Sequence, residues 1–285
     1  MNTEDADVVF PARVVATFLK RRVEVPSSAN TIVVAMDPSG GGSSSMSLVS
    51  TVMKNNQLVV VAFDEKPITN IAGMEVMLMR HVRVLQQQYI NHHLVFAFES
   101  NLGQEAGHAA AMLERNRVRN HYVIQEKDRV GVLTTASRKA LYADNLLFYM
   151  NQQAIGLRKG VVLTGNPSPG EEARVLQVLH EQLTNYRRVT VDSTVGRVAK
   201  RHFSGKIAGS RQGAWSLCPL CLFLFLFYSL SCANIHTKLN HFSYLRRRSR
   251  VNFAIERLLE RTLDRAVDSR CQFHSVRLTN FNGYF

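Results

Sequence analysis

The first 217 residues of this 285-residue chain contain no cysteine, and all four cysteines lie at or after residue 218. A disulfide framework is therefore excluded from most of the chain, which fits a reducing compartment. Residues 1–10 are polar and acidic and lack the apolar core of a secretory signal, so we expect no such signal. Residues 212–237 lack any charged side chain, which sets the tail apart from the rest of the chain.

Positive charge exceeds negative charge over the chain, with a net charge of +13. Residues 1–210 hold 24 basic and 18 acidic side chains, and residues 211–285 hold 11 and 4. Clustered basic side chains concentrate phosphate groups, so one interpretation is a polyanionic partner. The other interpretation is a solvated basic surface. A hydrophobic content of 46% is typical of a globular protein.

Three strands joined by short turns are predicted near the start of the chain. Residues 31–36 (TIVVAM) form a β-branched run that suits a strand buried on both faces. A Pro-Ser-Gly-Gly-Gly turn follows Asp37, and Asn55-Asn56 separates two further strands, residues 47–53 and 57–63. This spacing predicts an antiparallel meander.

Helices and strands alternate after this meander. Apolar residues recur at spacings of three and four in residues 71–89, which predicts a helix packed on one side. The remaining predicted elements are strand 92–98, helix 103–118, strand 122–125, helix 134–155, strand 160–163, helix 171–186 and strand 188–192. The pattern indicates an α/β domain, a mixed sheet flanked by helices, in the element order of the ribonuclease-H-like fold.

Composition divides the chain into three parts. Residues 1–29 are expected to be a linker with a lead-in helix, and residues 30–209 the ribonuclease-H-like domain. Residues 210–285 form a divergent tail with an apolar stretch and a basic amphipathic helix.

Two carboxylates end the two most apolar strands. Asp37 follows residues 31–36, and Glu99 follows residues 92–98. Acidic side chains at the carboxyl ends of buried strands are rigidly held and exposed at the sheet edge, where α/β proteins bind ligands. Oxygen ligands of this kind suit Mg²⁺ or Mn²⁺. The alternative is that Asp37 is a turn residue and Glu99 a helix cap.

Four stretches resemble the nuclease domain of the herpesvirus DNA-packaging terminase large subunit, in that family's order. They are residues 33–42 (VVAMDPSGGG), 96–106 (FAFESNLGQEA), 131–135 (GVLTT) and 203–206 (FSGK). The resemblance extends from about residue 10 to residue 209.

The resemblance implies a two-metal-ion DNA endonuclease that uses Mg²⁺ or Mn²⁺. It would cut concatemeric double-stranded viral DNA into genome units for packaging into capsids, in the host cell nucleus. The implied partners are other terminase subunits and the capsid portal. Asp37 and Glu99 correspond to the first two acids of the family's metal site, with Asp37 bridging the ions and Glu99 holding one.

The third acid of the family is absent from its expected place. In the family it lies in an Asp-Asp pair shortly after the SGK stretch, whereas residues 207–255 of this chain contain no acid and the next one is Glu256. Asp192 precedes the stretch and matches no family acid. The alternative function is therefore a catalytically incomplete relic or truncated domain that binds DNA or terminase partners without cutting.

The chain also lacks the G-x-x-x-x-G-K-[ST] motif of the family's ATPase motor, so at most the nuclease portion is expected here. Six basic side chains are candidates for phosphate contacts, with ordinary surface charge as the alternative. They are Arg138, Lys139, Arg187, Arg188, Lys200 and Arg201.

The tail offers three further features. The apolar stretch that begins at Leu217 and ends at Ala233 has the length of a short membrane span, but non-family sequence without such a role is the preferred interpretation. A zinc site at Cys218, Cys221, Cys232 and His236 is disfavoured, because the Leu/Phe run among them lacks the turns of a zinc knuckle. The arginine run 246–250 is either a nuclear address or a solvated patch.

Overall fold

The computed structural model describes residues 8–27, 29–38, 45–54, 57–101, 104–126, 128–191 and 200–204. These residues all belong to one compact unit of the chain, Met1–Leu230. The features predicted in the tail, namely the apolar stretch, the cysteines, the arginine run and the basic helix, lie outside the described residues, as does the glycine turn after Asp37.

A mixed eight-stranded sheet forms the centre of the described unit, in the order β1-β9-β4-β3-β2-β5-β6, with β10 pairing with β4. β2, β3 and β4 form the predicted antiparallel meander, whereas β5 runs parallel to β2 and β6 parallel to β5. The strands are β1 Arg22–Val23, β2 Thr31–Asp37, β3 Ser45–Lys54, β4 Gln57–Pro67, β5 His93–Phe98, β6 His121–Val123, β9 Ile155–Arg158 and β10 Leu163–Thr164.

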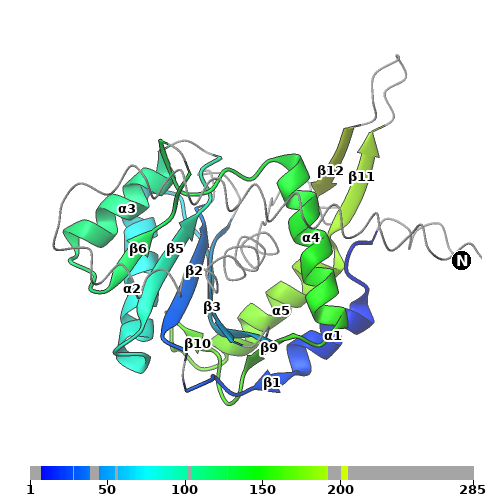
Figure 1. The fold of residues 1–285 in the computed structure, drawn as a ribbon, viewed down its shortest axis with the longest axis horizontal. Helices are drawn as coiled ribbons and strands as arrows, with labels where there is room; N and C mark the ends of the chain where they lie inside the picture. The colour runs from blue at the N-terminus through cyan, green and yellow to red at the C-terminus, as the bar shows by residue number, and fades with distance from the viewer. Residues whose placement is uncertain are drawn as a thin grey trace, which may run out of the picture. The chain divides into compact units, whose positions relative to one another are not determined.

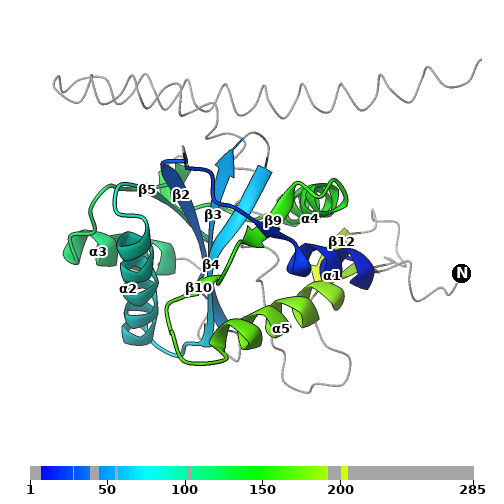
Figure 2. The ribbon, with the colours of Figure 1, turned by 90° about the horizontal axis from the view of Figure 1, so that it is seen from below.

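Helices cover both faces of the sheet (Figures 1 and 2). The helices are α1 Ala12–Lys20, α2 Ile71–Gln88, α3 Glu105–Arg115, α4 Ala136–Asn151 and α5 Glu171–Thr184. Alternate residues of β2 separate two cores: Val33 and Ala35 pack with α1, α4 and α5, while Ile32, Val34 and Met36 pack with α2 and α3. Because a strand buried on both faces has no polar side, this explains the continuous apolar run.

Two small antiparallel pairs complete the described elements. β7, Gln125–Glu126, pairs with β8, Arg129–Val130. β11, Arg187–Val191, pairs with β12, Lys200–Ser204, and contacts between α4 and β12 bring this pair beside the helix. The predicted fold class, a mixed sheet flanked by helices, is thus confirmed.

The predicted helix 134–155 is wrong at its C-terminal end. The helix ends at Asn151, and Ile155–Arg158 is strand β9, which lies between β1 and β4. Gln153 follows the helix cap with a left-handed φ of 51°, and the Ala154 amide donates to the Tyr149 carbonyl oxygen. Glycine usually occupies this position after a helix. Because this chain has glutamine there, its sequence does not indicate where the helix stops.

The segment before residue 30 contributes directly to the domain. α1 packs against α4, α5 and β9, and β1 adds an edge strand to the sheet by pairing with β9. Val15 and Phe18 of α1 are buried in the core that α4 and α5 share. The predicted lead-in helix is therefore part of the packing of this unit.

A buried polar network joins β3, β4 and α2. His81 Nδ1 lies 2.7 Å from Asp64 Oδ2, and His81 Nε2 lies 2.7 Å from Ser50 Oγ. The Gly165 amide also donates to Asp64 Oδ2, at 2.7 Å. The order of groups is that of a hydrolase triad, but Ser50 is completely buried, so no substrate reaches its hydroxyl. The network therefore acts in packing.

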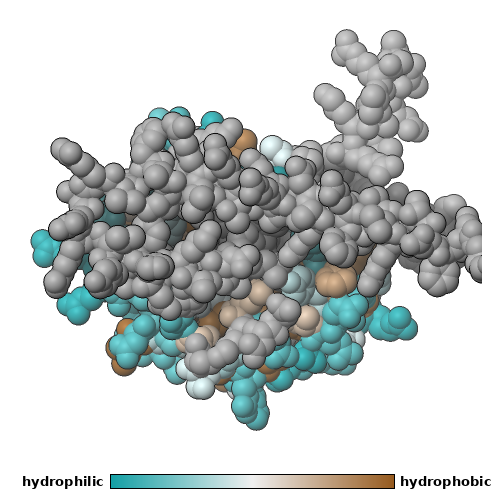
Figure 3. All heavy atoms as spheres, in the orientation of Figure 1, coloured by the Kyte–Doolittle hydropathy of each residue, from teal (hydrophilic) through white to brown (hydrophobic). Residues whose placement is uncertain are grey.

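Within the part of the chain that the structure describes, no helix is both long and apolar enough to cross a membrane. The described residues visible in Figure 3 are mostly hydrophilic, with small hydrophobic areas among them. Such scattered apolar residues are normal on a folded protein.

Candidate functional site

Asp37 and Glu99 occupy neighbouring positions at one edge of the sheet. β2 and β5 are parallel with Met36 opposite Phe98, and the Glu99 amide donates to the Met36 carbonyl oxygen at 2.9 Å. Val33, Ala35, Val95 and Ala97 face the core with α4 and α5, so strand periodicity places Asp37 and Glu99 on that same face. Since paired strands lie about 4.8 Å apart, the two carboxylates are close neighbours.

Only one of the two carboxylate oxygens of Glu99 is hydrogen-bonded within the part of the chain that the structure describes. The side-chain Nδ2 of Asn101 donates to Glu99 Oε1 at 2.7 Å and to the Thr134 carbonyl oxygen at 2.9 Å, and the Thr134 hydroxyl also donates to Glu99 Oε1. The Thr134 amide in turn donates to Asn101 Oδ1 at 2.8 Å. Glu99 is only 3% exposed, yet its Oε2 has no hydrogen-bond partner among the described residues. A buried carboxylate oxygen left open in this way is suited to a cation.

Gly131 and Val132 pack against the end of β5, next to Glu99. The Val132 amide donates to the Phe98 carbonyl oxygen at 2.7 Å, and the Ser100 amide donates to the Val132 carbonyl oxygen at 2.9 Å. Gly131 has a φ of 89°, and a Cβ there would lie 2.4 Å from the Phe98 carbonyl oxygen. Only glycine allows this close approach.

Replacing Gly131 by alanine is expected to lower the free energy of unfolding by more than about 2 kcal/mol, because left-handed strain and a backbone clash add up. Chemical denaturation measures the loss. Gly107→Ala is the matched control, since its Cβ would meet nothing within 4 Å. Because Gly107 lies in the first turn of α3, that change should stabilise the protein by at most about 0.5–1 kcal/mol, the value for a helix interior. Equal stability of the two variants would contradict the close contact at Gly131.

Positive charge faces the carboxylates from the start of α4. Lys139 Nζ lies 3.6 Å from Glu99 Oε1, with the lysine side chain 22% exposed. Thr135 caps the helix by accepting from the Arg138 amide, and the helix N-terminus adds a partial positive charge. This arrangement favours an anionic group such as a phosphodiester beside Glu99.

Two tyrosines near Glu99 stay neutral at physiological pH. Burial raises the pKa of Tyr142 to about 12, with smaller contributions from the charges of Glu126 and Glu99. Burial, together with the Glu99 charge, also raises the pKa of Tyr186. Neither side chain therefore adds a phenolate charge beside Glu99 at this pH.

Asp37 and Glu99 fit a divalent cation as oxygen ligands, but the described residues contain no group of three or more His, Cys, Asp or Glu side chains able to hold one. The next acid in the same row is Glu65, which is aligned with Ser47 of β3, itself opposite Asp37. Glu65 lies two strands from Asp37, roughly 10 Å away, and accepts from Gln182 at 3.3 Å.

The six predicted phosphate-contacting residues separate into two groups. Arg138 pairs with Glu126 at 2.8 Å and donates to the Leu133 carbonyl oxygen, whereas Lys139 faces Glu99. The other four lie on the β11–β12 pair, where Thr190 is opposite Arg201 and Val191 is opposite Lys200. Arg187 donates to the Thr184 carbonyl oxygen at 2.6 Å. The backbone thus collects Arg187, Arg188, Lys200 and Arg201 on one hairpin.

Sequence reasoning assigned no site role to Asn101 or Thr134, although both lie in stretches that carry the terminase resemblance. Their mutual hydrogen bonds join the stretch after β5 to the stretch before α4. The only signal in the sequence was the presence of both stretches in the family's order. Which residue of one stretch meets which residue of the other depends on the fold.

Comparison with known proteins was informative only for structure. No family model matches the chain, and no curated protein matches its sequence. A human cytomegalovirus terminase nuclease domain, Mn soaked and inhibitor bound, superposes with a TM-score of 0.51 and 14% identity, over 62% of this chain and 86% of that one. The same domain, Mn soaked, gives 0.51 and 12%, over 76% and 94%. The chain therefore has the ribonuclease-H-like fold of terminase nuclease domains.

Proposed function

We propose that this protein is the metal-dependent endonuclease portion of a viral DNA-packaging terminase. The observation that carries the proposal is the pairing of Asp37 with Glu99 on adjacent strands, with Glu99 Oε2 buried and open. The fold supports it, because the similar cytomegalovirus domains are terminase nucleases that were soaked with Mn.

In this proposal each residue near the carboxylates has a distinct task. Asp37 and Glu99 would hold Mg²⁺ or Mn²⁺ through their carboxylate oxygens. When bound, these ions supply Lewis acidity and activate a water for phosphodiester hydrolysis. Asn101 and Thr134 fix Glu99 Oε1 so that Oε2 stays turned to a ligand. Lys139 and the start of α4 attract the phosphodiester.

The biological setting is part of the same proposal. The substrate is concatemeric double-stranded viral DNA, cut into genome units during packaging into capsids. The partners are other terminase subunits and the capsid portal, and the location is the host cell nucleus. The likeness to the cytomegalovirus domain and the basic net charge support this setting.

The test is cleavage of supercoiled plasmid by the purified chain in Mn²⁺. The wild-type chain is expected to nick or linearise the plasmid, and Asp37→Ala to lose at least about 100-fold in rate, since a carboxylate ligand of a catalytic cation is removed. Loss of wild-type cleavage on chelation with EDTA is the accompanying control. Cleavage that persists in the Asp37→Ala protein would identify a contaminant or another site and refute the assignment.

A second candidate is a non-catalytic domain that binds DNA or terminase partners. It is favoured by the lack of a third acid after the SGK stretch and by the absence of a three-ligand group among the described residues. The same experiment separates the candidates. If neither protein cleaves but both bind DNA, the non-catalytic function holds.

A further inference from the structure

A basic hollow lies at the end of the sheet opposite Asp37 and Glu99. It has a volume of about 550 Å³ and is formed by the C-terminal half of α2 and the connection from α3 to β6. β5 begins at this end and reaches the carboxylate edge after six residues, roughly 20 Å away. The hollow is also on the α2–α3 face of the sheet, whereas the carboxylates face α4. It is therefore separate from the candidate metal site.

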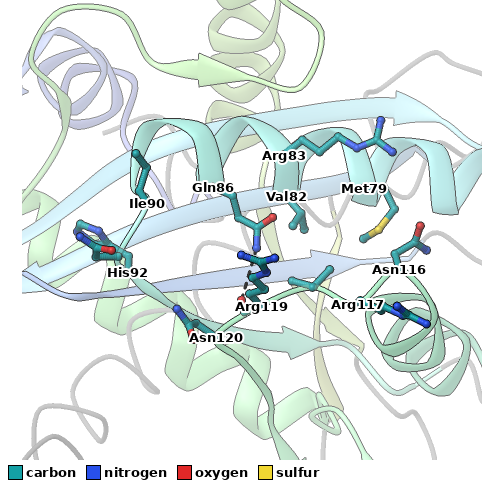
Figure 4. A pocket seen from close by; sticks show the side chains of 12 residues that line it. Met79, Val82, Arg83, Gln86, Ile90, His92, Asn116, Arg117, Arg119 and Asn120 are labelled. Atoms are coloured by element: carbon teal, nitrogen blue, oxygen red, sulfur yellow. Dashed lines mark hydrogen bonds between the residues drawn. The ribbon is translucent and has the colours of Figure 1, made fainter.

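Three arginines line the hollow from two elements (Figure 4). Arg83 comes from α2, and Arg117 and Arg119 come from the α3–β6 connection. Carboxamides of Gln86, Asn91, Asn116 and Asn120 lie among them, and none of the described residues that line the hollow is acidic. Gln86 reaches from α2 to the Arg119 carbonyl oxygen at 3.4 Å, which joins the two walls.

The three arginines make no ion pair with any described residue, while the acids close by are already paired. Glu75 binds Arg115 and Asn116, and Glu114 lies 3.4 Å from His121. Burial lowers the pKa of His92, another lining residue, so the arginines carry the positive charge of the hollow at neutral pH.

Arg117 occupies a backbone position that glycine usually fills. Its φ is 50°, and it ends α3 in a Schellman motif: the Val118 amide donates to the Leu113 carbonyl oxygen and the Arg117 amide to that of Glu114. A left-handed conformation is strained for a residue with a side chain. The turn that ends α3 thus places Arg117 among the residues that line the hollow.

We propose that this hollow binds phosphate groups of a nucleic-acid backbone, as a second DNA contact away from the cutting edge. The proposal rests on the proposed function, which supplies DNA as the ligand. Planar guanidinium groups match phosphate oxygens in two-point hydrogen bonds, and the carboxamides of Gln86, Asn91 and Asn120 can donate to further phosphate or sugar oxygens. The Asn116 carboxamide already donates to Glu75 and to the Met112 carbonyl oxygen. An open hollow without acidic residues suits a continuous backbone whose charges are shared between several arginines.

The test is binding of a labelled 30-base-pair duplex by the full chain in EDTA. Fluorescence anisotropy measures the affinity at several salt concentrations. The Arg83→Gln/Arg117→Gly double variant removes two cations. Glycine relieves the left-handed strain at position 117, so thermal unfolding should show a folded protein. The matched control is Arg13→Gln/Lys20→Gln, which removes the same charge from exposed positions of α1.

The arginine variant is expected to bind on the order of 10-fold more weakly than wild type, with a salt slope reduced by about 2, one for each lost phosphate contact. The control should bind within about twofold of wild type. Equal binding by wild type and the arginine variant, or no binding by wild type, overturns the inference. So does competition by poly-glutamate as effective as that by unlabelled duplex, which would indicate a protein partner. A mononucleotide that binds tightly while the variant keeps its DNA affinity would likewise overturn it.

This experiment is independent of the cleavage test, because no metal is present. If the wild-type chain cleaves DNA in Mn²⁺ but the arginine variant and the control variant bind DNA equally well, only the second contact is refuted. Loss of DNA affinity in the arginine variant, together with no cleavage in Mn²⁺, supports the contact and refutes the proposed nuclease activity.

Discussion

Glu99→Gln is expected to abolish both the stabilisation of the protein by Mn²⁺ and its cleavage of plasmid. A ligand that binds only the folded state at 100 times its Kd adds about 2.7 kcal/mol to stability, so Mn²⁺ should raise the wild-type Tm by several degrees. Glutamine keeps an oxygen for Asn101 and Thr134 but removes the charge and one of the two oxygens that a cation needs. Differential scanning fluorimetry with and without MnCl₂ measures the shift.

Glu65→Gln is the matched control for this prediction. Glu65 lies in the same row across the sheet as Asp37, but two strands away and bound to Gln182. Its variant should keep the Mn²⁺-induced shift of the wild type. A shift that survives in Glu99→Gln, or disappears in Glu65→Gln, would show that the cation is not held by the Asp37–Glu99 pair. Because Tm reports binding, the result is informative even for a chain that does not cut.

His81→Leu is expected to be among the most destabilising substitutions in this domain, at about 3–5 kcal/mol. Leucine would fill much of the space of the ring, but Asp64 would lose its His81 partner and keep only the Gly165 amide in a buried site. Asp64 is 6% exposed, so water cannot replace the lost hydrogen bond. The measurement is chemical denaturation followed by circular dichroism.

Ser50→Ala tests the same network from its other end. It removes the hydroxyl that contacts His81 Nε2 and leaves the Asp64–His81 pair intact. The expected loss of stability is smaller, about 1–2 kcal/mol, because a neutral hydrogen bond is broken and no charged group loses its partner. A loss from Ser50→Ala as large as that from His81→Leu would contradict the view that the Asp64 charge dominates. The double variant should lose less than the two single losses together, since the residues share one network.

Much of the fold could be predicted from the sequence because its elements have strong local patterns. The apolar run 31–36 and the striped segment 71–89 correspond closely to β2 and α2. The C-terminal end of α4 could not be predicted in this way. Gln153 takes the left-handed position there, and β9 is a strand only because Leu58 and Val60 of β4 pair with Ile155 and Leu157.

The candidate site shows the same division. Asp37 and Glu99 were candidates because each ends a buried strand, and the resemblance to terminase nuclease domains assigned them to a metal site. The sequence does not state that β5 lies beside β2, and this pairing alone makes the two acids neighbours. Arg138 and Lys139 were equal candidates for phosphate contacts, yet their partners differ: Glu126 for one and Glu99 for the other.

The sequence by itself determined the α/β class, the two strand-end carboxylates, the missing acid after the SGK stretch and the excess of basic side chains. The class, the carboxylates and the charge depend on composition and on spacings of a few residues, whereas the missing acid is defined by the resemblance to terminase nuclease domains. Only the tertiary structure decided that Glu99 has one oxygen fixed by Thr134 and one left open, and that Arg83 and Arg117 line one hollow. These residues are 34 or 35 positions apart in the sequence, and only strand pairing and helix packing bring such distant segments together.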